Sequence, residues 1–410
     1  MQRVPTSGVA TLAACVFVLA DGSTLEAQES ATGSHAGHDH TLHDHAAHAS
    51  APLNAPSDGA VSGPVLAAVV DLLADVSDPD AGEHGFDAEL RSFEAQVSGA
   101  LAPNWWAYAV AVADAEDVEL EEAALHWSGI DDATTLRLGR FFVDFGEQMR
   151  LHVHELPYVD RPGVLAEYLG DELIGVGAEF ERVWSLTSRG RLRTVVGAFT
   201  DFDGGHAEED GGVAVELADR RGLGDLVFTA RVAPTFDVGA DSELHFGASA
   251  RHLADFAFVD EANALEAPEA SNTVIGGDVR FSSGVRDTTS GWSIGGEYLI
   301  ALGDVGAEPD VGLTLLEVFD ERVAGFHVWG ERRFGRVNAV GALVGSFEHP
   351  EPGTPRDAEY ALFFTRRVAE PVRLRVQVSQ FDSEEASDEL RVALQLTAYL
   401  GSHVHGPRDG

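Results

Sequence analysis

Most of this chain alternates between apolar and polar side chains with a period of two residues, over segments of about ten residues. The alternation is clearest in residues 243–251, 292–300, 372–380 and 389–400. A period of two indicates β-strands, because successive side chains of a strand point to opposite faces. About sixteen such segments lie between residues 65 and 400, separated by turns rich in Gly, Asp, Pro and Asn. The fold is therefore predicted to be all-β.

Both a soluble sandwich or propeller and a transmembrane barrel can be built from many alternating strands. The predicted strands are long enough to cross a bilayer at a tilt, whereas soluble strands usually have about five or six residues. Their polar faces contain paired charges, such as Arg191 with Arg193, which a water-filled lumen tolerates. Aromatic residues near segment ends, among them Trp105, Tyr108 and Phe363, suit interfacial girdles. These features favour a transmembrane antiparallel β-barrel of roughly 16 strands over residues 65–401.

The net charge of −41 results from 68 acidic residues and 27 basic residues, and every basic residue is arginine. Such a chain repels nucleic acid and anionic lipid head groups, so no nucleic-acid partner is expected. Adaptation to a salty habitat and a cation-attracting surface or lumen would both produce this acidity. Composition alone leaves these two explanations open.

The N-terminal segment predicts export. A basic start, a weakly apolar stretch from Val9 to Ala20 and small residues around Ala27 form the pattern of a secretory signal peptide over residues 1–27. A disordered leader and a lipoprotein cleavage box at Cys15 are the alternatives. Cys15 is the single cysteine, so removal of the signal would leave a mature protein without disulfides.

A histidine-rich tail and linker are predicted over residues 28–64, which lack apolar periodicity and are therefore expected to be disordered. Imidazoles and carboxylates are ligands for zinc, copper or nickel, so the tail is a candidate site for Zn²⁺ or another divalent metal. No cofactor is expected to be required. A polar spacer is the alternative interpretation. The candidate ligands are His35, His38, His40, His43, His45 and His48. A second short tail is expected over residues 402–410.

One connection, residues 147–173, is much longer than its neighbours. Its segment DRPGVLAEYLGDE predicts a short helix, with Asp160 as the N-cap and Pro162 in the first turn. A loop of this length beside a wide lumen is expected to fold inward and narrow it, or to cover its mouth.

The region from Ala100 to Glu147 resembles porin-type outer-membrane barrels, including phosphate-selective porins, in which paired strands lead to an LRxGxFxxxFG segment. The continuation RLHVHELPYVDRPGVLAEYLGDE, residues 150–172, resembles a bacterial group described as zinc-regulated outer-membrane proteins, as does the closing segment LQLTAYLGSHVH. The resemblance implies a barrel in the cell outer membrane that acts as a channel. The basic clusters of a phosphate-selective channel are not evident in so acidic a chain.

The long loop contains an H-x-H pair, His152 and His154, followed by Glu155 and Asp160. Two histidines at this spacing on an extended segment point their rings to the same side, which makes them candidate metal ligands. The alternative is that these side chains hydrogen-bond the loop to the barrel wall, with Arg161 pairing to wall carboxylates.

Charged side chains on the polar strand faces are predicted to line a pore. Both signs occur, so opposing stripes of charge are expected, and the overall acidity predicts a modest cation bias. The predicted pore-lining residues are Glu179, Glu181, Arg191, Arg193, Glu243, Arg251, Glu297, Glu331, Arg333, Arg373, Arg375 and Arg391.

The expected function is passive diffusion of small hydrophilic solutes or ions through a porin-like outer-membrane channel. The alternative is a barrel that takes up or binds zinc or another divalent metal without being an open pore. An enzyme is not expected, since no G-x-S-x-G nucleophile motif occurs. A TonB-dependent receptor would need about 22 strands and a plug, which the chain is too short to supply. Outer-membrane lipid is an expected partner, and association into a homotrimer stays open.

Overall fold

The computed structural model describes residues 64–78, 85–115, 117–203, 213–217, 222–260, 262–284, 290–310, 314–351, 353–383 and 389–401. The predicted signal peptide, the six histidines of the N-terminal tail and the predicted C-terminal tail all lie outside the described residues.

Strands dominate the described part of the chain. Their bounds are β1 Val65–Ser77, β2 Phe86–Ala102, β3 Trp105–Ala113, β4 Val118–Trp127, β5 Thr134–Phe142, β6 Ile174–Thr187, β7 Gly190–Asp203, β8 Ala214–Leu217, β9 Val227–Asp237, β10 Ser242–Asp260, β11 Leu265–Ser283, β12 Ser290–Pro309, β13 Leu316–Phe334, β14 Asn338–Phe347, β15 Asp357–Ala369, β16 Val372–Asp382 and β17 Glu389–Leu400. The described helices are the α-helix α2, Gly163–Leu169, and the 3₁₀ turns η1, Val153–Glu155, and η2, Leu223–Asp225.

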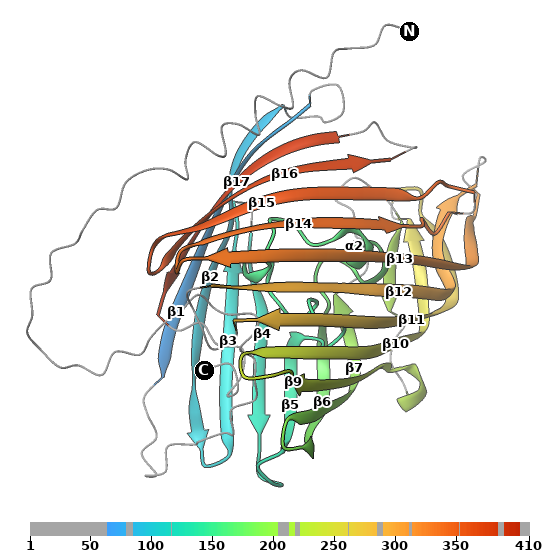
Figure 1. Cartoon of the computed structure of the whole chain (residues 1–410). Helices are drawn as coiled ribbons and strands as arrows, with labels where there is room; N and C mark the ends of the chain where they lie inside the picture. Colours follow the sequence, from blue (N-terminus) through green and yellow to red (C-terminus); the bar gives the residue numbers. More distant parts are fainter. Residues whose placement is uncertain are drawn as a thin grey trace, which may run out of the picture. The chain divides into compact units, whose positions relative to one another are not determined.

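The strands form one antiparallel sheet that closes on itself. Neighbours along the chain pair with each other, and β17 pairs with β1 (Figure 1). β7 pairs directly with β9, whereas the short β8 pairs with the part of β10 beyond β9. Of the seventeen strands, sixteen therefore make the wall and β8 is an addition to it. Closure removes the exposed sheet edges that lipid could not satisfy, and it confirms the predicted barrel.

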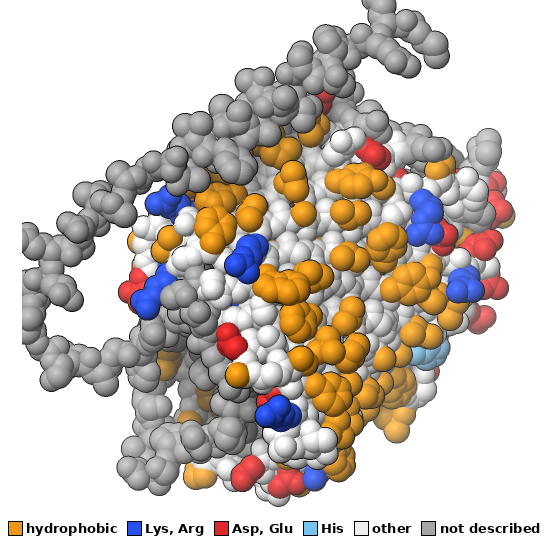
Figure 2. All heavy atoms as spheres, in the orientation of Figure 1, with side chains coloured by type: hydrophobic (Ala, Val, Ile, Leu, Met, Phe, Trp, Pro, Cys, Tyr) orange, Lys and Arg blue, Asp and Glu red, His pale blue; other side chains and the backbone are white. Residues whose placement is uncertain are grey.

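The wall exposes apolar side chains and buries polar ones, which is the reverse of a soluble protein. On β17, Leu394 is 44% exposed while the adjacent Gln395 is 1% exposed. On β9, Val232 is 47% exposed while Arg231 is 2% exposed. Hydrophobic side chains accordingly spread over the outer surface in Figure 2. Apolar residues face outward and polar residues face inward, as in a barrel surrounded by lipid.

Helices contribute no candidate for crossing a membrane: in the part of the chain that the structure describes, none is long and apolar enough to span one.

The wall is taller on one side. β10, β11 and β13 have 19 residues each and β12 has 20, whereas β3 and β5 have 9 residues each. The predicted length of about ten residues is therefore wrong for the tall side. Asp255 and Glu269 have left-handed backbone inside β10 and β11, and the pairing of these strands shifts register nearby. Such bulges let a strand continue through residues that are typical of turns.

The main apolar core lies inside the barrel. The connection between β5 and β6, residues 143–173 and hereafter the inward loop, folds into the interior, where α2 is surrounded by strands in Figure 1. Val143, Phe145 and Met149 of the loop are fully buried and belong to the largest hydrophobic cluster, together with wall residues such as Leu299. An inward fold is one of the two positions that its length led us to expect.

Three local expectations are wrong. The N-cap of α2 is Pro162 rather than Asp160, whose carboxylate instead accepts hydrogen bonds from Arg91 and Arg391 on the wall. The long connection begins at residue 143 rather than 147, because β5 ends at Phe142. Tyr108 and Phe363 are buried rather than placed in an interfacial girdle.

Candidate functional site

The inward loop is fixed to β16 through its own backbone. Arg375 donates hydrogen bonds to the carbonyl oxygens of Leu156 and Tyr158, at 2.5 and 2.7 Å. Its remaining contacts are the side chains of Thr365, at 3.2 Å, and Gln395, at 2.6 Å. The guanidinium is buried, and these acceptors satisfy it in a fixed planar arrangement.

Strands β10 and β12 hold the beginning of the loop. The carboxylate of Glu297 on β12 accepts the backbone N–H groups of Glu147 and Gln148, at 3.0 and 3.2 Å. The hydroxyl of Ser249 on β10 accepts the N–H of Gly146, at 3.1 Å. Gly146 has φ of 61°, and a Cβ there would lie 2.1 Å from the Glu297 carboxylate. The glycine that ends the LRxGxFxxxFG segment thus lets the loop turn against the wall.

Helix α2 completes the attachment. The N–H of Gly163 donates to Glu359 on β15, at 3.1 Å, and the hydroxyl of Tyr168 donates to the carbonyl of Glu348, at 2.8 Å. Val164 and Phe347 belong to the same hydrophobic cluster. With the contacts on β10, β12 and β16, the loop reaches the wall in several directions and therefore occupies much of the lumen cross-section.

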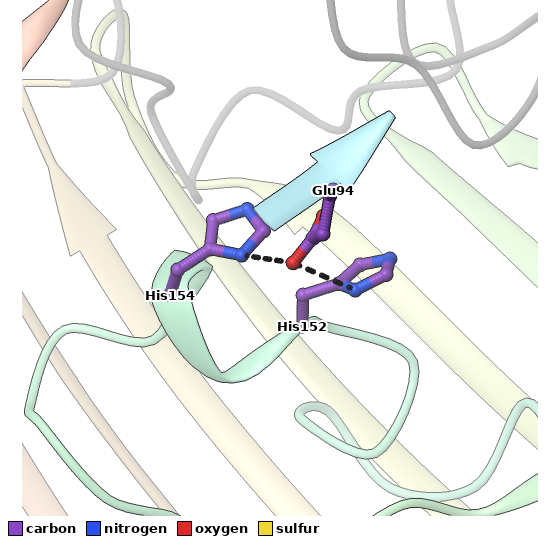
Figure 3. A group of neighbouring side chains, drawn as sticks. All are labelled: Glu94, His152 and His154. Carbon is purple, nitrogen blue, oxygen red and sulfur yellow. Dashed lines mark ion pairs between the residues drawn. The ribbon is translucent and has the colours of Figure 1, made fainter. Parts of the chain in front are cut away.

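A cluster of imidazoles and carboxylates lies where the loop meets β2 and β4. His154 Nδ1 is 2.9 Å from Glu94 Oε1, and His152 Nδ1 is 3.6 Å from the same oxygen (Figure 3). His152 Nδ1 is also 3.2 Å from Glu121 Oε1, and its Nε2 is 3.5 Å from Glu122 Oε1. All five side chains are less than 4% exposed. We call these five residues the lumen histidine cluster.

The cluster favours positive charge. Burial by itself would lower the pKa of His152, but the carboxylates of Glu121 and Glu94 outweigh burial and raise this pKa well above its ordinary value. Burial, and next the charge of Glu121, raise the pKa of the loop residue Glu172 to about 7. A buried site with several carboxylates around two imidazoles suits protons or a metal cation.

A β-bulge brings two consecutive glutamates to the same side. Val110 pairs with Glu122, but the next residue, Ala111, pairs with Leu120, so Glu121 is the extra residue on β4. Both glutamates are consequently buried, although strict alternation would place them on opposite faces. Sequence reasoning missed Glu94, Glu121 and Glu122, and the adjacent glutamates of LEEA were the available signal.

The other loop residues singled out from the sequence have different partners. Glu155 accepts the backbone N–H of His152, at 3.2 Å. Arg161 donates to the carbonyls of Gln148 and Leu151, at 2.9 and 2.8 Å. Pairing of Arg161 with wall carboxylates is thus replaced by bonds inside the loop, which shape its first turn.

A second group of possible ligands, Glu147, His245 and Asp278, is already matched by arginines. Arg231 donates to both oxygens of Asp278, at 2.6 and 3.1 Å, and Arg280 lies 2.7 Å from Glu147. Burial alone would raise the pKa of Glu147, but the charge of Arg280 outweighs burial and lowers it. Fixed positive charge therefore occupies the place that a metal would need.

None of the twelve predicted pore-lining side chains is exposed on the outer surface. Ion pairs join several of them: Arg193 bonds to Glu181 at 2.8 Å, and Arg191 lies 3.5 Å from Glu243. Buried members are Glu179, Glu243, Arg251, Glu297, Arg333 and Arg375, and half-buried members are Glu181, Arg191, Arg193, Glu331, Arg373 and Arg391. Bonds to the inward loop are made by six of them: Glu179, Arg193, Glu297, Arg373, Arg375 and Arg391.

A cavity of about 530 Å³ remains beside α2. Its lining includes Glu167 and Tyr168 of the helix, Arg251 and Asp260 of β10, and His349 of the connection after β14. Asp260 and His349 place it at the barrel end where the inward loop begins, and its walls combine charged and apolar side chains.

His349 should remain protonated well above neutral pH. Hydrogen bonding to Glu167 raises its pKa to about 9, with Asp357, 2.8 Å away, also raising it and burial opposing. Because the folded-state pKa is above the unfolded value, this stabilisation is complete below about pH 6.5 and disappears as pH rises through about 9. NMR titration of ring-labelled histidine in detergent, with His349→Gln to assign the signal, should give a midpoint near 9. A midpoint near 6.5 would contradict this contact.

Comparisons with known proteins show the fold. No family model matches the chain, and no curated protein gives a significant match. Among solved structures, it is similar to the anion-selective porin of Comamonas acidovorans, with 10% identity, a TM-score of 0.55, and coverage of 83% of this chain and 100% of that one. It is similar to a loop L8 deletion mutant of OmpT, an outer membrane protein of Vibrio cholerae, with 12% identity, a TM-score of 0.53 and coverage of 83% and 100%. It is also similar to the outer membrane channel DcaP of Acinetobacter baumannii, with 13% identity, a TM-score of 0.51, and coverage of 83% of this chain and 99% of that one. The chain therefore has the barrel fold of bacterial outer-membrane porins.

Proposed function

We propose that the protein is a porin-like channel of the cell outer membrane, in which small hydrophilic solutes or ions diffuse through a lumen narrowed by the inward loop. The observation on which this rests is the inverted barrel: apolar side chains face outward, polar side chains face inward, and a long loop crosses the interior. Water and ions require a continuous polar lining, and a folded-in loop limits the size of what passes. The porin fold of the similar structures supports the same function.

The lumen charge supports a cation bias. Among the buried side chains of the described residues, eleven are Asp or Glu and five are Arg. An excess of carboxylates in a confined, partly dry space raises the local concentration of cations and repels anions. Phosphate selectivity would need the opposite balance, so it is not proposed.

A closed barrel is the second candidate. Val143, Phe145, Leu156 and Val159 of the inward loop have no exposed surface, so the apolar middle of the loop leaves little room for water. In that case the protein would bind a divalent metal without conducting.

The histidine-rich tail lies outside the described residues. It is proposed to bind Zn²⁺ or a similar ion whether or not the barrel conducts. Homotrimer formation stays a prediction.

The two candidates differ in single-channel currents. Purified full-length protein in a planar bilayer should give discrete conductance steps, and under a KCl gradient the reversal potential should show K⁺ favoured over Cl⁻ by roughly two- to tenfold. The lumen carboxylates cause this preference, so it should shrink at high salt, where charges are screened. A silent bilayer with folded protein would favour the closed barrel, and an anion-selective current would contradict the proposed bias. Heat-modifiable migration on gels provides the folding control.

A further inference from the structure

We propose that the lumen histidine cluster binds one divalent transition-metal ion, with His152, His154, Glu94 and Glu121 as ligands. The ion would join the inward loop to strands β2 and β4. This inference goes beyond channel function, because the site requires neither conduction nor an open lumen.

Three of the four ligand atoms, those of Glu94, His152 and His154, already lie close to one another, and the fourth, of Glu121, lies near His152. A zinc ion roughly 2.0–2.2 Å from four tetrahedral ligands holds neighbouring ligand atoms about 3.3 Å apart. In the structure, Glu94 Oε1 is 2.9 Å from His154 Nδ1 and 3.6 Å from His152 Nδ1, and Glu121 Oε1 is 3.2 Å from His152 Nδ1. The ligand atoms of Glu94 and the two histidines all lie within 4.8 Å of one another. Figure 3 shows both rings turned toward the Glu94 carboxylate.

The contacts around the ligands hold them in position. Glu122 Oε1 is 3.5 Å from Nε2 of His152, on the side of the ring away from the ligand atom. The other oxygen of Glu122 accepts the Tyr108 hydroxyl, at 2.6 Å, and the N–H of Phe142, at 3.2 Å. A carboxylate behind a metal-binding imidazole fixes the tautomer and ring orientation and strengthens the ligand. Arg373 on β16 donates to the carbonyl oxygen of His154, which fixes the backbone of the H-x-H pair.

Charge favours a dication at this position. Glu94, Glu121 and Glu122 are each at most 3% exposed, and burying three carboxylates together requires compensating positive charge. In the second group, near Glu147 and Asp278, guanidinium groups provide that charge. In the lumen histidine cluster the carboxylates surround two imidazoles, whose ring nitrogens can bind a metal.

The ligand types indicate the class of metal. Two imidazoles and two carboxylates suit Zn²⁺ and, by the general order of affinities, also Cu²⁺ and Ni²⁺. Ca²⁺ and Mg²⁺ prefer sites made of oxygen ligands and should bind far more weakly. Because four protein ligands complete a tetrahedron, the ion would serve as a fixed link in the loop rather than activate water.

Metal counting tests the site directly. The full-length chain with the six tail histidines replaced by asparagine should, after chelator treatment and reloading in detergent, retain about one zinc per chain by elemental analysis following gel filtration. Adding His152→Gln and His154→Gln should reduce this to about zero. His245→Gln, in the arginine-matched group, is the matched control and should leave it unchanged. Zinc retention in the double variant, or its absence in the parent, would overturn the proposal.

Single substitutions of the glutamates test the site if the double histidine variant does not fold. Glu94→Gln should weaken Zn²⁺ binding at least about 100-fold, and Glu122→Gln, which keeps all four ligands, about 10- to 100-fold. Co²⁺ in the parent should give the intense visible bands of tetrahedral coordination, and weak octahedral bands would contradict the assigned ligands. None of these measurements involves current, so a failure of the metal site and a failure of the channel proposal are distinguishable.

Discussion

Replacing the inward loop by a short turn should raise the single-channel conductance several-fold. The replacement is feasible because Phe142 and Ile174 are direct partners in the ladder between β5 and β6, so a turn of a few residues can join them. The loop contacts strands across the lumen, including β10, β12, β15 and β16, and therefore occupies cross-section that ions would otherwise use. Conductance follows the width and lining of the narrowest part of a pore.

The measurement is single-channel recording of the shortened chain beside the parent in the same lipid and salt. Removing the loop also removes apolar partners of wall residues such as Leu299, so folding must be verified by heat-modifiable migration. Shortening the connection between β4 and β5, residues 128–133, is a control for a change in loop length that leaves residues 143–173 and their partners intact. Folded barrels with unchanged conductance would show that the current does not pass the inward loop.

Arg375→Met should release the middle of the inward loop while leaving the sheet of the barrel intact. The substitution keeps an extended side chain but removes the donors to Leu156, Tyr158 and Gln395. Hydrogen bonds from a charged donor contribute about 1.5–3 kcal/mol each and are not additive, so we expect a loss of about 3–5 kcal/mol in loop attachment. The wall itself is held by backbone ladders that this change does not touch.

Hydrogen exchange of the backbone N–H groups of Leu156, Tyr158 and Val159 measures this effect. These amides should exchange at least about 100-fold faster in Arg375→Met than in the parent, given the lost attachment energy. Arg332→Met, at an exposed position of β13, applies the same chemical change and should leave the loop amides unaffected. Equal protection in both variants would indicate that apolar packing of Tyr158 and Phe363 holds the loop without the arginine.

The sequence by itself determined the strands and the direction of their faces. A strand has a side-chain period of two, so the alternation of Leu394 with Gln395 fixed which residues meet lipid and which meet the lumen. That choice needs no knowledge of distant partners, because one local pattern repeats around the barrel. The length of the connection after Phe142 and its H-x-H pair were equally visible in the sequence.

Only the tertiary structure decided what the loop meets. Glu94 is 58 residues before His152, and the pairing of strands β2 to β5 together with docking of the loop brings their side chains together. The bulge that turns Glu121 and Glu122 to the same side depends on pairing between β3 and β4, and local alternation predicts the reverse. Long-range contacts are set by strand register and by the packing of the loop, and no single segment of the sequence contains that information. The barrel could therefore be predicted from the sequence, whereas the candidate site could be identified only in the tertiary structure.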